Sequence, residues 1–236
     1  MNFKYLPIKN GKQIGKKRPL SQIKFIVIHY TGNYNKGADA MAHFRYLQNA
    51  IRPGSAHYFV DDKNIIQTIG DSFVAWGVGD NQGYGRFLNG CNNSNSISIE
   101  MCVNIDSNQA LMYKNTLELT KNLMKKFNID ADHVCRHYDV SKKDCPHNFR
   151  NNNWEKWWQF KEEIKRPIEW EIDLSKDSVF GEGVKKVEEK TEIKKEHWAE
   201  KHFESLKNKG IEINEKRFDE PMTRGEVFAL IDRILK

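Results

Sequence analysis

The chain has 236 residues, of which 39% are hydrophobic and 11% aromatic, so it can form a packed core and wholesale disorder is excluded. The formal net charge of +6 is uneven: residues 1–165 hold 23 basic against 15 acidic side chains, and residues 166–236 hold 15 against 17. A basic first part suits an anionic partner such as nucleic acid, anionic lipid or a bacterial wall polymer, although a solvated lysine-rich surface has the same composition.

The first residues contain no apolar run typical of a signal peptide, and no segment reaches the roughly 18 apolar residues of a membrane span. We therefore expect synthesis in the cytoplasm without a signal peptide, and no membrane partner. In a reducing compartment, the four cysteines are expected to be free or metal-bound rather than bridged. They are Cys91, Cys102, Cys135 and Cys145.

The first half of the chain predicts alternating strands and helices. The apolar, β-branched run 23–32 predicts a buried central strand, and the apolar spacing in 38–49 predicts a helix. Residues 56–70 predict two short strands around a turn at 61–64. The Gly- and Asn-rich stretch 77–94 predicts a long loop, a kind of segment that often carries function.

The next strand and two helices complete the expected first domain. The alternation in 96–104 predicts a strand with Ile97, Ile99 and Met101 on one face and Glu100 on the other. Amphipathic helices are expected at 112–128 and 154–165. This order predicts an α/β fold with a mixed central β-sheet flanked by helices.

The character of the sequence changes after residue 165. We expect a catalytic domain in 1–165, a charged linker in 166–194 and a small helical domain in 195–236. The last part predicts helices at 197–210 and 222–235. Two helices bury little surface alone, so this part is expected to dock on the first domain or on copies of itself, which would make a homo-oligomer.

The stretch CRHYDVSKKDCPHN, residues 135–148, is unusually rich in potential metal ligands. His137 and Cys145 are eight residues apart, and a turn can bring both to one ion. His29 ends an apolar strand and is the candidate third ligand. Two histidines and one cysteine suit a catalytic zinc ion, which keeps one position for water. Singly, each residue is more often structural: a satisfied histidine, or a small buried cysteine.

Two further side chains suit hydrolytic chemistry at such a site. Glu100 can act as a general base, and Lys143 can stabilise an oxyanion. The alternatives are an edge-strand glutamate that faces solvent and an ordinary solvated lysine.

The motifs FIVIHYTG, AHYFVDD, AWGVGD, SISIEMCVN and RHYDVSKKDCP, in this order over about residues 20–160, resemble the type 2 N-acetylmuramoyl-L-alanine amidase family. That family shares its fold with peptidoglycan recognition proteins. The resemblance implies one Zn²⁺ per chain on His29, His137 and Cys145, with catalytic roles for Glu100 and Lys143. It implies hydrolysis of the amide between N-acetylmuramic acid and L-alanine of peptidoglycan. With a small C-terminal module and no signal peptide, the chain is similar to phage endolysins, which act on the cell wall after release.

The sequence also departs from the family pattern. Many members have a histidine where this chain has Gly77, and a substrate contact there is expected to be missing or supplied by Tyr84 or Arg86. Trp76 in the same motif and His57 are further predicted substrate contacts. His147 could compete as a ligand, but Cys145 fits the family spacing.

The C-terminal part resembles a single S-layer homology repeat, which implies binding of a secondary cell-wall polymer. The predicted contacts are Trp198, Arg217, Thr223 and Arg224. The alternative is a helical appendage that supports stability or dimerisation.

Two other functions are alternatives to the amidase. A wall-binding recognition module of the same fold would lack catalysis, and Cys145 with Lys143 and Glu100 favours the enzyme over it. Nucleic acid is not an expected partner, because no nucleic-acid-binding motif accompanies the basic charge.

Overall fold

The computed structural model describes residues 2–78, 90–174, 184–186 and 200–210. The chain divides into two compact units, Met1–Val187 and Glu188–Lys236. Within the second unit the described element is α5 (Glu200–Asn208), which lies inside the helix predicted at 197–210. No helix of the described residues has both the length and the apolar character needed to cross a bilayer.

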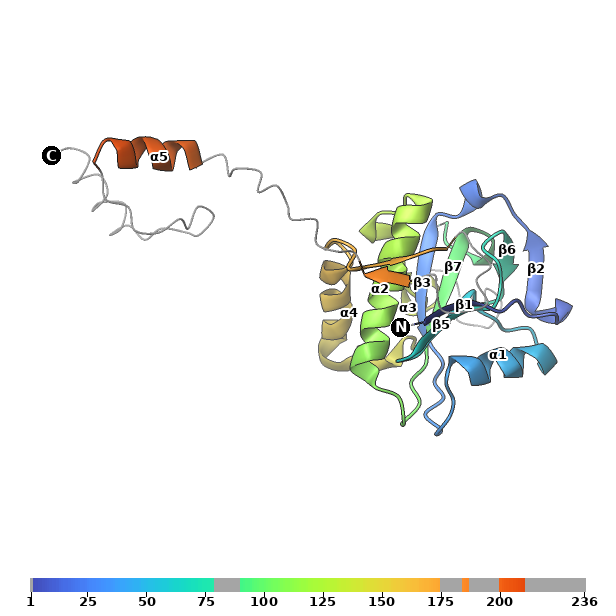
Figure 1. The fold of residues 1–236 in the computed structure, drawn as a ribbon. Coiled ribbons are helices and arrows are strands. Elements are labelled where there is room, and N and C mark those ends of the chain that lie inside the picture. The colour runs from blue at the N-terminus through green and yellow to red at the C-terminus, as the bar shows by residue number, and fades with distance from the viewer. Residues whose placement is uncertain (1, 79–89, 175–183, 187–199, 211–236) are drawn as a thin grey trace. The chain divides into compact units, whose positions relative to one another are not determined.

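A six-stranded sheet forms the centre of the first unit (Figure 1). Neighbouring strands run parallel except for one antiparallel pair, β4 with β5. In spatial order the strands are β1 (Asn2–Tyr5), β5 (Asn64–Gln67), β4 (Tyr58–Val60), β7 (Ser96–Met101), β3 (Phe25–Tyr30) and β8 (Val134–Arg136). Two antiparallel pairs lie outside this sheet: β2 (Ile14–Lys17) with β6 (Phe73–Ala75), and β9 (Trp170–Ile172) with β10 (Val184–Lys186).

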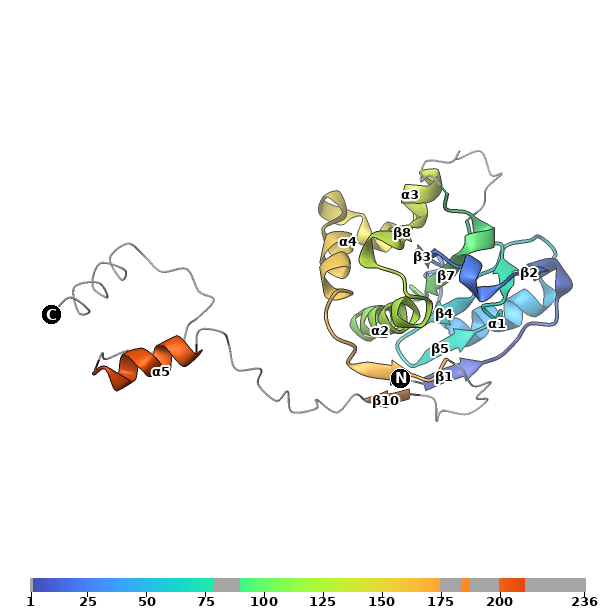
Figure 2. The same ribbon diagram turned by 90° about the horizontal axis from the view of Figure 1, so that it is seen from above.

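Helices cover both faces of the sheet, with α2 and α4 on one side and α1 on the other (Figure 2). The helices of the first unit are α1 (Ala40–Asn49), α2 (Gln109–Phe127), α3 (His137–Ser141) and α4 (Asn151–Glu163). Side-chain caps define two of their starts, because Asp39 accepts from the Ala42 N–H and Asn108 from the Ala110 N–H. The mixed α/β fold with helices on the sheet is confirmed.

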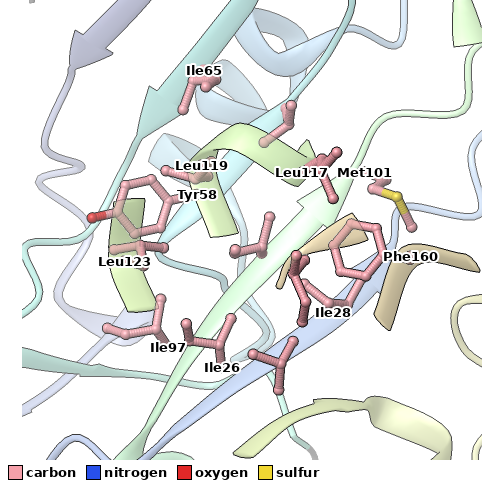
Figure 3. Close-up of a cluster of buried hydrophobic side chains, with 14 of the residues drawn as sticks. Ile26, Ile28, Tyr58, Ile65, Ile97, Met101, Leu117, Leu119, Leu123 and Phe160 are labelled. Carbon is pink, nitrogen blue, oxygen red and sulfur yellow. The ribbon is translucent and has the colours of Figure 1, made fainter. Parts of the chain in front are cut away.

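The main core lies between the sheet and the pair α2 and α4. Ile97, Ile99 and Met101 are fully buried there, so the predicted inner face of β7 is confirmed. Side chains of β3 and α2 meet them in the same cluster (Figure 3). Each large aliphatic side chain buried in this way contributes about 1.5–3 kcal/mol. Ser98 and Glu100 therefore lie on the opposite face of β7.

The predicted elements of the first domain are confirmed, and several short elements were missed. The predicted strands and helices of the first domain coincide with β3, β4, β5, β7, α1, α2 and α4. The missed elements are β1, β2, β6, β8, β9 and α3, each of three to five residues. Elements this short show little periodicity, and β4 and β5 were predicted only because their apolar runs flank a turn signal at 61–64.

The first unit extends beyond residue 165, where its end was predicted. Glu118 of α2 accepts hydrogen bonds from the N–H groups of Glu169 and Trp170, at 2.8 and 2.9 Å. Asn122 donates to the Trp170 carbonyl at 2.7 Å and accepts from the Ile172 N–H at 2.9 Å. Ile172 is buried in the main core. The start of the expected linker is therefore part of the first unit. It is attached through Glu118 and Asn122 of α2, which the sequence of the linker itself does not indicate.

We predict that Glu118→Ala strongly destabilises the first unit. Glu118 is 1% exposed and pairs at 2.8 Å with Lys121, which is 3% exposed. The substitution leaves a buried ammonium without its partner, a loss of about 3–5 kcal/mol. The matched control is Glu162→Ala, which breaks an exposed pair of the same spacing with Lys165 and should cost less than about 1 kcal/mol. Urea unfolding of both variants measures the difference, and equal stabilities would contradict the prediction.

Candidate active site

Three potential metal ligands meet inside the first unit. One ligand atom from each of His29, His137 and Cys145 lies within 4.8 Å of the other two, and all three residues are buried. The two Nδ1 atoms are 3.0 Å apart, and Cys145 Sγ is 3.9 Å from His29 Nδ1. Zinc bonds of ordinary length in a tetrahedron would separate two nitrogens by about 3.3 Å and a nitrogen from a sulfur by about 3.6 Å. The described separations are close to both values.

The parallel strands explain how residues over a hundred positions apart meet. β3 pairs with β8 with Ile28 opposite Arg136, so His29, the next residue of β3, and His137, the first residue after β8, lie at the same edge of the sheet. The Tyr138 N–H then donates to the Cys145 carbonyl at 2.8 Å, which closes the turn and brings the cysteine back to the two histidines.

Arg136 and Asp139 fix the start of α3, on which His137 is the first residue. Asp139 accepts from the Arg136 N–H at 2.8 Å and from its Nε at 3.0 Å. The guanidinium also lies 4.3 Å from the centre of the Trp154 ring. Asp139 and Arg136 thus fix the turn from which His137 starts α3.

Hydrogen bonding assigns the tautomer of His137. Its Nε2 is 2.8 Å from the Val78 carbonyl, which can only accept, so Nε2 carries the proton and Nδ1 is left bare toward the cluster. A backbone carbonyl behind a ligating imidazole is typical of metal sites. Neither the Val78 carbonyl nor Arg136 was predicted as part of the site, and a backbone carbonyl leaves no signal in the sequence.

Burial keeps both imidazoles in the neutral form that binds metal. Desolvation, followed by the charge of Lys143, lowers the pKa of His137 to about 4. The pKa of His29 is lowered well below its usual value, first by desolvation and then by His137. Burial raises the pKa of the Cys145 thiol, so ionisation of this group needs a nearby cation. His29 Nε2 is buried without a partner among the described residues. The donor set fits zinc: two neutral imidazoles and one thiol.

Glu100 lies directly beside the cluster. It is the register partner of His29 across β7 and β3. Its side chain is half-buried, and Oε2 is out of contact with solvent and with any described hydrogen-bond partner. Desolvation raises the pKa of Glu100 to about 7, although the Lys143 charge opposes the shift. A carboxyl group with a pKa near neutrality can both take and return a proton.

Lys143 is half-buried and faces the same site. Its charge acts on Glu100 and on both histidines. A half-buried ammonium whose charge acts on these three groups differs from a fully solvated surface lysine. His147, the possible competing ligand, is instead exposed and lies 2.8 Å from Asp144 Oδ2.

The His57 ring is buried, and both of its nitrogens contact other groups of the protein. The ring is 1% exposed, its Nδ1 accepts from the Ser98 N–H, and its Nε2 lies 3.1 Å from the Phe73 carbonyl. Arg18 Nη2 lies 2.9 Å from Nε2. Desolvation and then the Arg18 charge lower the pKa of His57 to about 3. Both ring nitrogens are engaged, which favours a structural role over the predicted substrate contact.

The other predicted substrate contacts are placed only in part. Trp76 is 38% exposed just beyond β6, and its backbone N–H donates to Ser55 Oγ. Tyr84 and Arg86 lie outside the described residues, as do the predicted wall-polymer contacts Trp198, Arg217, Thr223 and Arg224.

Gly77, where the family resemblance places a histidine, packs closely on β7. A Cβ atom at this position would lie 2.3 Å from Ser98 Oγ and 2.8 Å from Ser98 Cβ. No larger side chain fits here unless Ser98 moves. At the position where the family pattern has a histidine, the backbone of this chain therefore lies too close to β7 for a side chain.

Comparison with known proteins agrees with this geometry. Residues 19–148 match the family model of N-acetylmuramoyl-L-alanine amidases. N-acetylmuramoyl-L-alanine amidase XlyA of Bacillus subtilis is 39% identical over 122 residues, which are 52% of this chain and 39% of XlyA. BlyA of the same organism, also an N-acetylmuramoyl-L-alanine amidase, is 32% identical over 235 residues, covering 88% of this chain and 62% of BlyA.

The solved structure of the XlyA catalytic domain superposes with a TM-score of 0.60 at 34% identity, covering 70% of this chain and 99% of that domain. The chain spans about two fifths of the length of XlyA and three fifths of that of BlyA. The family model covers more than half of the residues, including His29, Glu100, His137 and Cys145. The chain therefore belongs to the N-acetylmuramoyl-L-alanine amidase family.

Proposed function

We propose that this protein is a zinc-dependent hydrolase that cleaves the amide bond between N-acetylmuramic acid and L-alanine in bacterial peptidoglycan and so lyses the cell wall. The observation that carries the proposal is the meeting of His29, His137 and Cys145 beside Glu100 in a chain of the amidase family. XlyA and BlyA are named for the same activity.

His29, His137 and Cys145 would hold one zinc ion, which supplies a Lewis acid that polarises the scissile carbonyl and makes water more acidic. Glu100 takes a proton from the attacking water as the new C–O bond forms. Lys143 stabilises the negative charge that develops on the carbonyl oxygen. Glu100 then returns the proton to the departing nitrogen as the C–N bond breaks, which leaves a lactyl carboxylate and a free alanine amine.

The second unit is assigned a supporting role in this proposal. We take residues 195–236 as a module that binds a secondary wall polymer, with dimerisation as the alternative. Wall anchoring would raise the local concentration of the enzyme on its substrate. Peptidoglycan is thus the proposed substrate, and the cell wall, reached after release from the producing cell, is the proposed place of action.

We predict that Cys145→Ser removes zinc and activity together. The wild type should carry about one zinc ion per chain, because the three ligands form one cluster. The serine hydroxyl is a poorer zinc ligand than a thiolate, so metal content, release of amino groups from purified walls and lysis should all fall. Metal analysis and amine labelling measure these quantities.

Cys91→Ser is the matched control, because Cys91 is equally buried and lies outside the ligand cluster. It should retain zinc and activity. A wild type without zinc that still binds walls would contradict the proposal and favour the recognition module.

We predict that Glu100→Gln separates chemistry from metal binding. The amide cannot take a proton from water, so the hydrolysis rate should fall by about 10²–10⁴-fold. Zinc content should be unchanged, because Glu100 is not among the three ligands. Glu155→Gln, an exposed change on α4, is the control and should keep the full rate. A Glu100→Gln variant with near wild-type hydrolysis would refute the assigned proton transfer.

A further inference from the structure

A groove of 640 Å³ lies apart from the ligand cluster, between the segment after β7, the start of α2 and the helix α4. Part of the groove wall is formed by three segments that follow active-site residues in the sequence. They contribute Tyr34, residues 103–105 and residues 148–149. Neither the proposed chemistry nor any predicted substrate contact uses this groove.

The groove is within reach of a polymer bound at the active site. Tyr34 follows His29 by five residues, and Asn148 follows Cys145 by three. A fully extended chain covers at most about 3.6 Å per residue, so Tyr34 lies within about 18 Å of His29 and Asn148 within about 11 Å of Cys145. Ile105 likewise follows Glu100 at the end of β7, which runs parallel to β3. Groove and active site thus lie toward the same edge of the sheet.

The groove has an exposed apolar rim over a buried floor. Tyr34 is 53% exposed and Ile105 80% exposed, whereas Met112 and Phe149 beneath them are each 2% exposed. Large apolar side chains that stay in water around a concave site are typical of a surface that binds a ligand.

Two residues of the lining, Asn104 and Asn148, have a buried amide oxygen without a hydrogen-bond partner among the described residues. Asn104 is 4% exposed, and its Nδ2 donates to Asp106 Oδ1 at 2.8 Å, which fixes the orientation of the amide. Its Oδ1 is left without a hydrogen bond among the described residues, as is Oδ1 of Asn148. A buried acceptor left unpaired costs about 1–3 kcal/mol, so these two oxygens mark a strained polar wall of the groove.

The remaining polar lining has the same character. The Nε2 groups of Gln109 and Gln159 already donate, to the Asn104 carbonyl and to Glu163. Their oxygens are left as acceptors. Lys156 is the one charged side chain among the lining residues that the structure describes. The groove therefore suits a neutral ligand that has many donors and apolar faces.

We propose that this groove binds the amino-sugar chain of peptidoglycan, next to the muramic acid whose amide is cleaved. The inference rests on the proposed function. Pyranose rings present C–H faces to Tyr34 and Ile105, and their hydroxyl and acetamido N–H groups donate to the amide oxygens. The stem peptide fits less well, because its carboxylates would find only Lys156 as a counter-charge.

The test uses the full-length ¹⁵N-labelled protein and a neutral tetramer of N-acetylglucosamine, with the dissociation constant taken from amide NMR shifts. The tetramer should shift the amides of Val103 and Ile105. The double variant Tyr34→Ala/Ile105→Ser should weaken binding by about five- to tenfold. The control Tyr46→Ala/Ile51→Ser changes side chains that are 66% and 79% exposed and lie outside the groove, and it should bind as the wild type does.

Three results would overturn the groove assignment: no shift at Val103 and Ile105, equal binding by the groove variant, or weakened binding of a synthetic L-Ala-D-Glu-L-Lys peptide in place of the sugar. All four substituted residues are exposed, so the variants should fold, and circular dichroism checks this. Failure of the proposed function looks different. A protein that binds the tetramer at these amides but releases no alanine amine from walls would keep the groove and refute the amidase.

Discussion

The parallel pairing of β3 with β7 and β8 is the constraint on which the site depends. Its register places His29 opposite Glu100 and brings His137 out of the sheet at the same edge. A shift of one residue would turn His29 or Glu100 toward the core under α2. The packing of Ile97, Ile99 and Met101 against that helix therefore fixes the active site as well as the stability of the sheet.

The ionisable groups of the site are buried, and desolvation determines their pKa values. Desolvation keeps the histidines neutral and raises the pKa of Glu100, while Lys143 acts against the second effect. Such an arrangement costs folding free energy, since Glu100 Oε2 and His29 Nε2 are buried without partners among the described residues. Shifted pKa values of this kind, caused by burial and a specific neighbouring charge, are typical of functional sites.

The sequence was sufficient for the central strands, the long helices and the grouping of His29, Glu100, His137 and Cys145. Continuous apolar runs and the spacing of His137 and Cys145 are signals within short stretches of sequence. The family motifs then relate these stretches to His29 and Glu100, which lie far from them in the sequence. The environment of His57 could not be predicted, because its partners Phe73, Ser98 and Arg18 are 16 to 41 residues away. The same holds for the Val78 carbonyl behind His137, and for the short strands, which form only because neighbouring strands pair with them.

The attachment of residues 169–172 to α2 bears on how this chain can exchange modules with others. Lytic enzymes built from separate parts can recombine wherever the junction crosses no shared core. Here Glu118 and Asn122 hold the chain past residue 165, and Ile172 is part of the core. A crossover at the end of α4 would leave polar groups of α2 buried and unpaired. A chimera that folds should therefore have its junction beyond Leu174. The segment that must be transferred intact is then longer than the residues 19–148 that match the family.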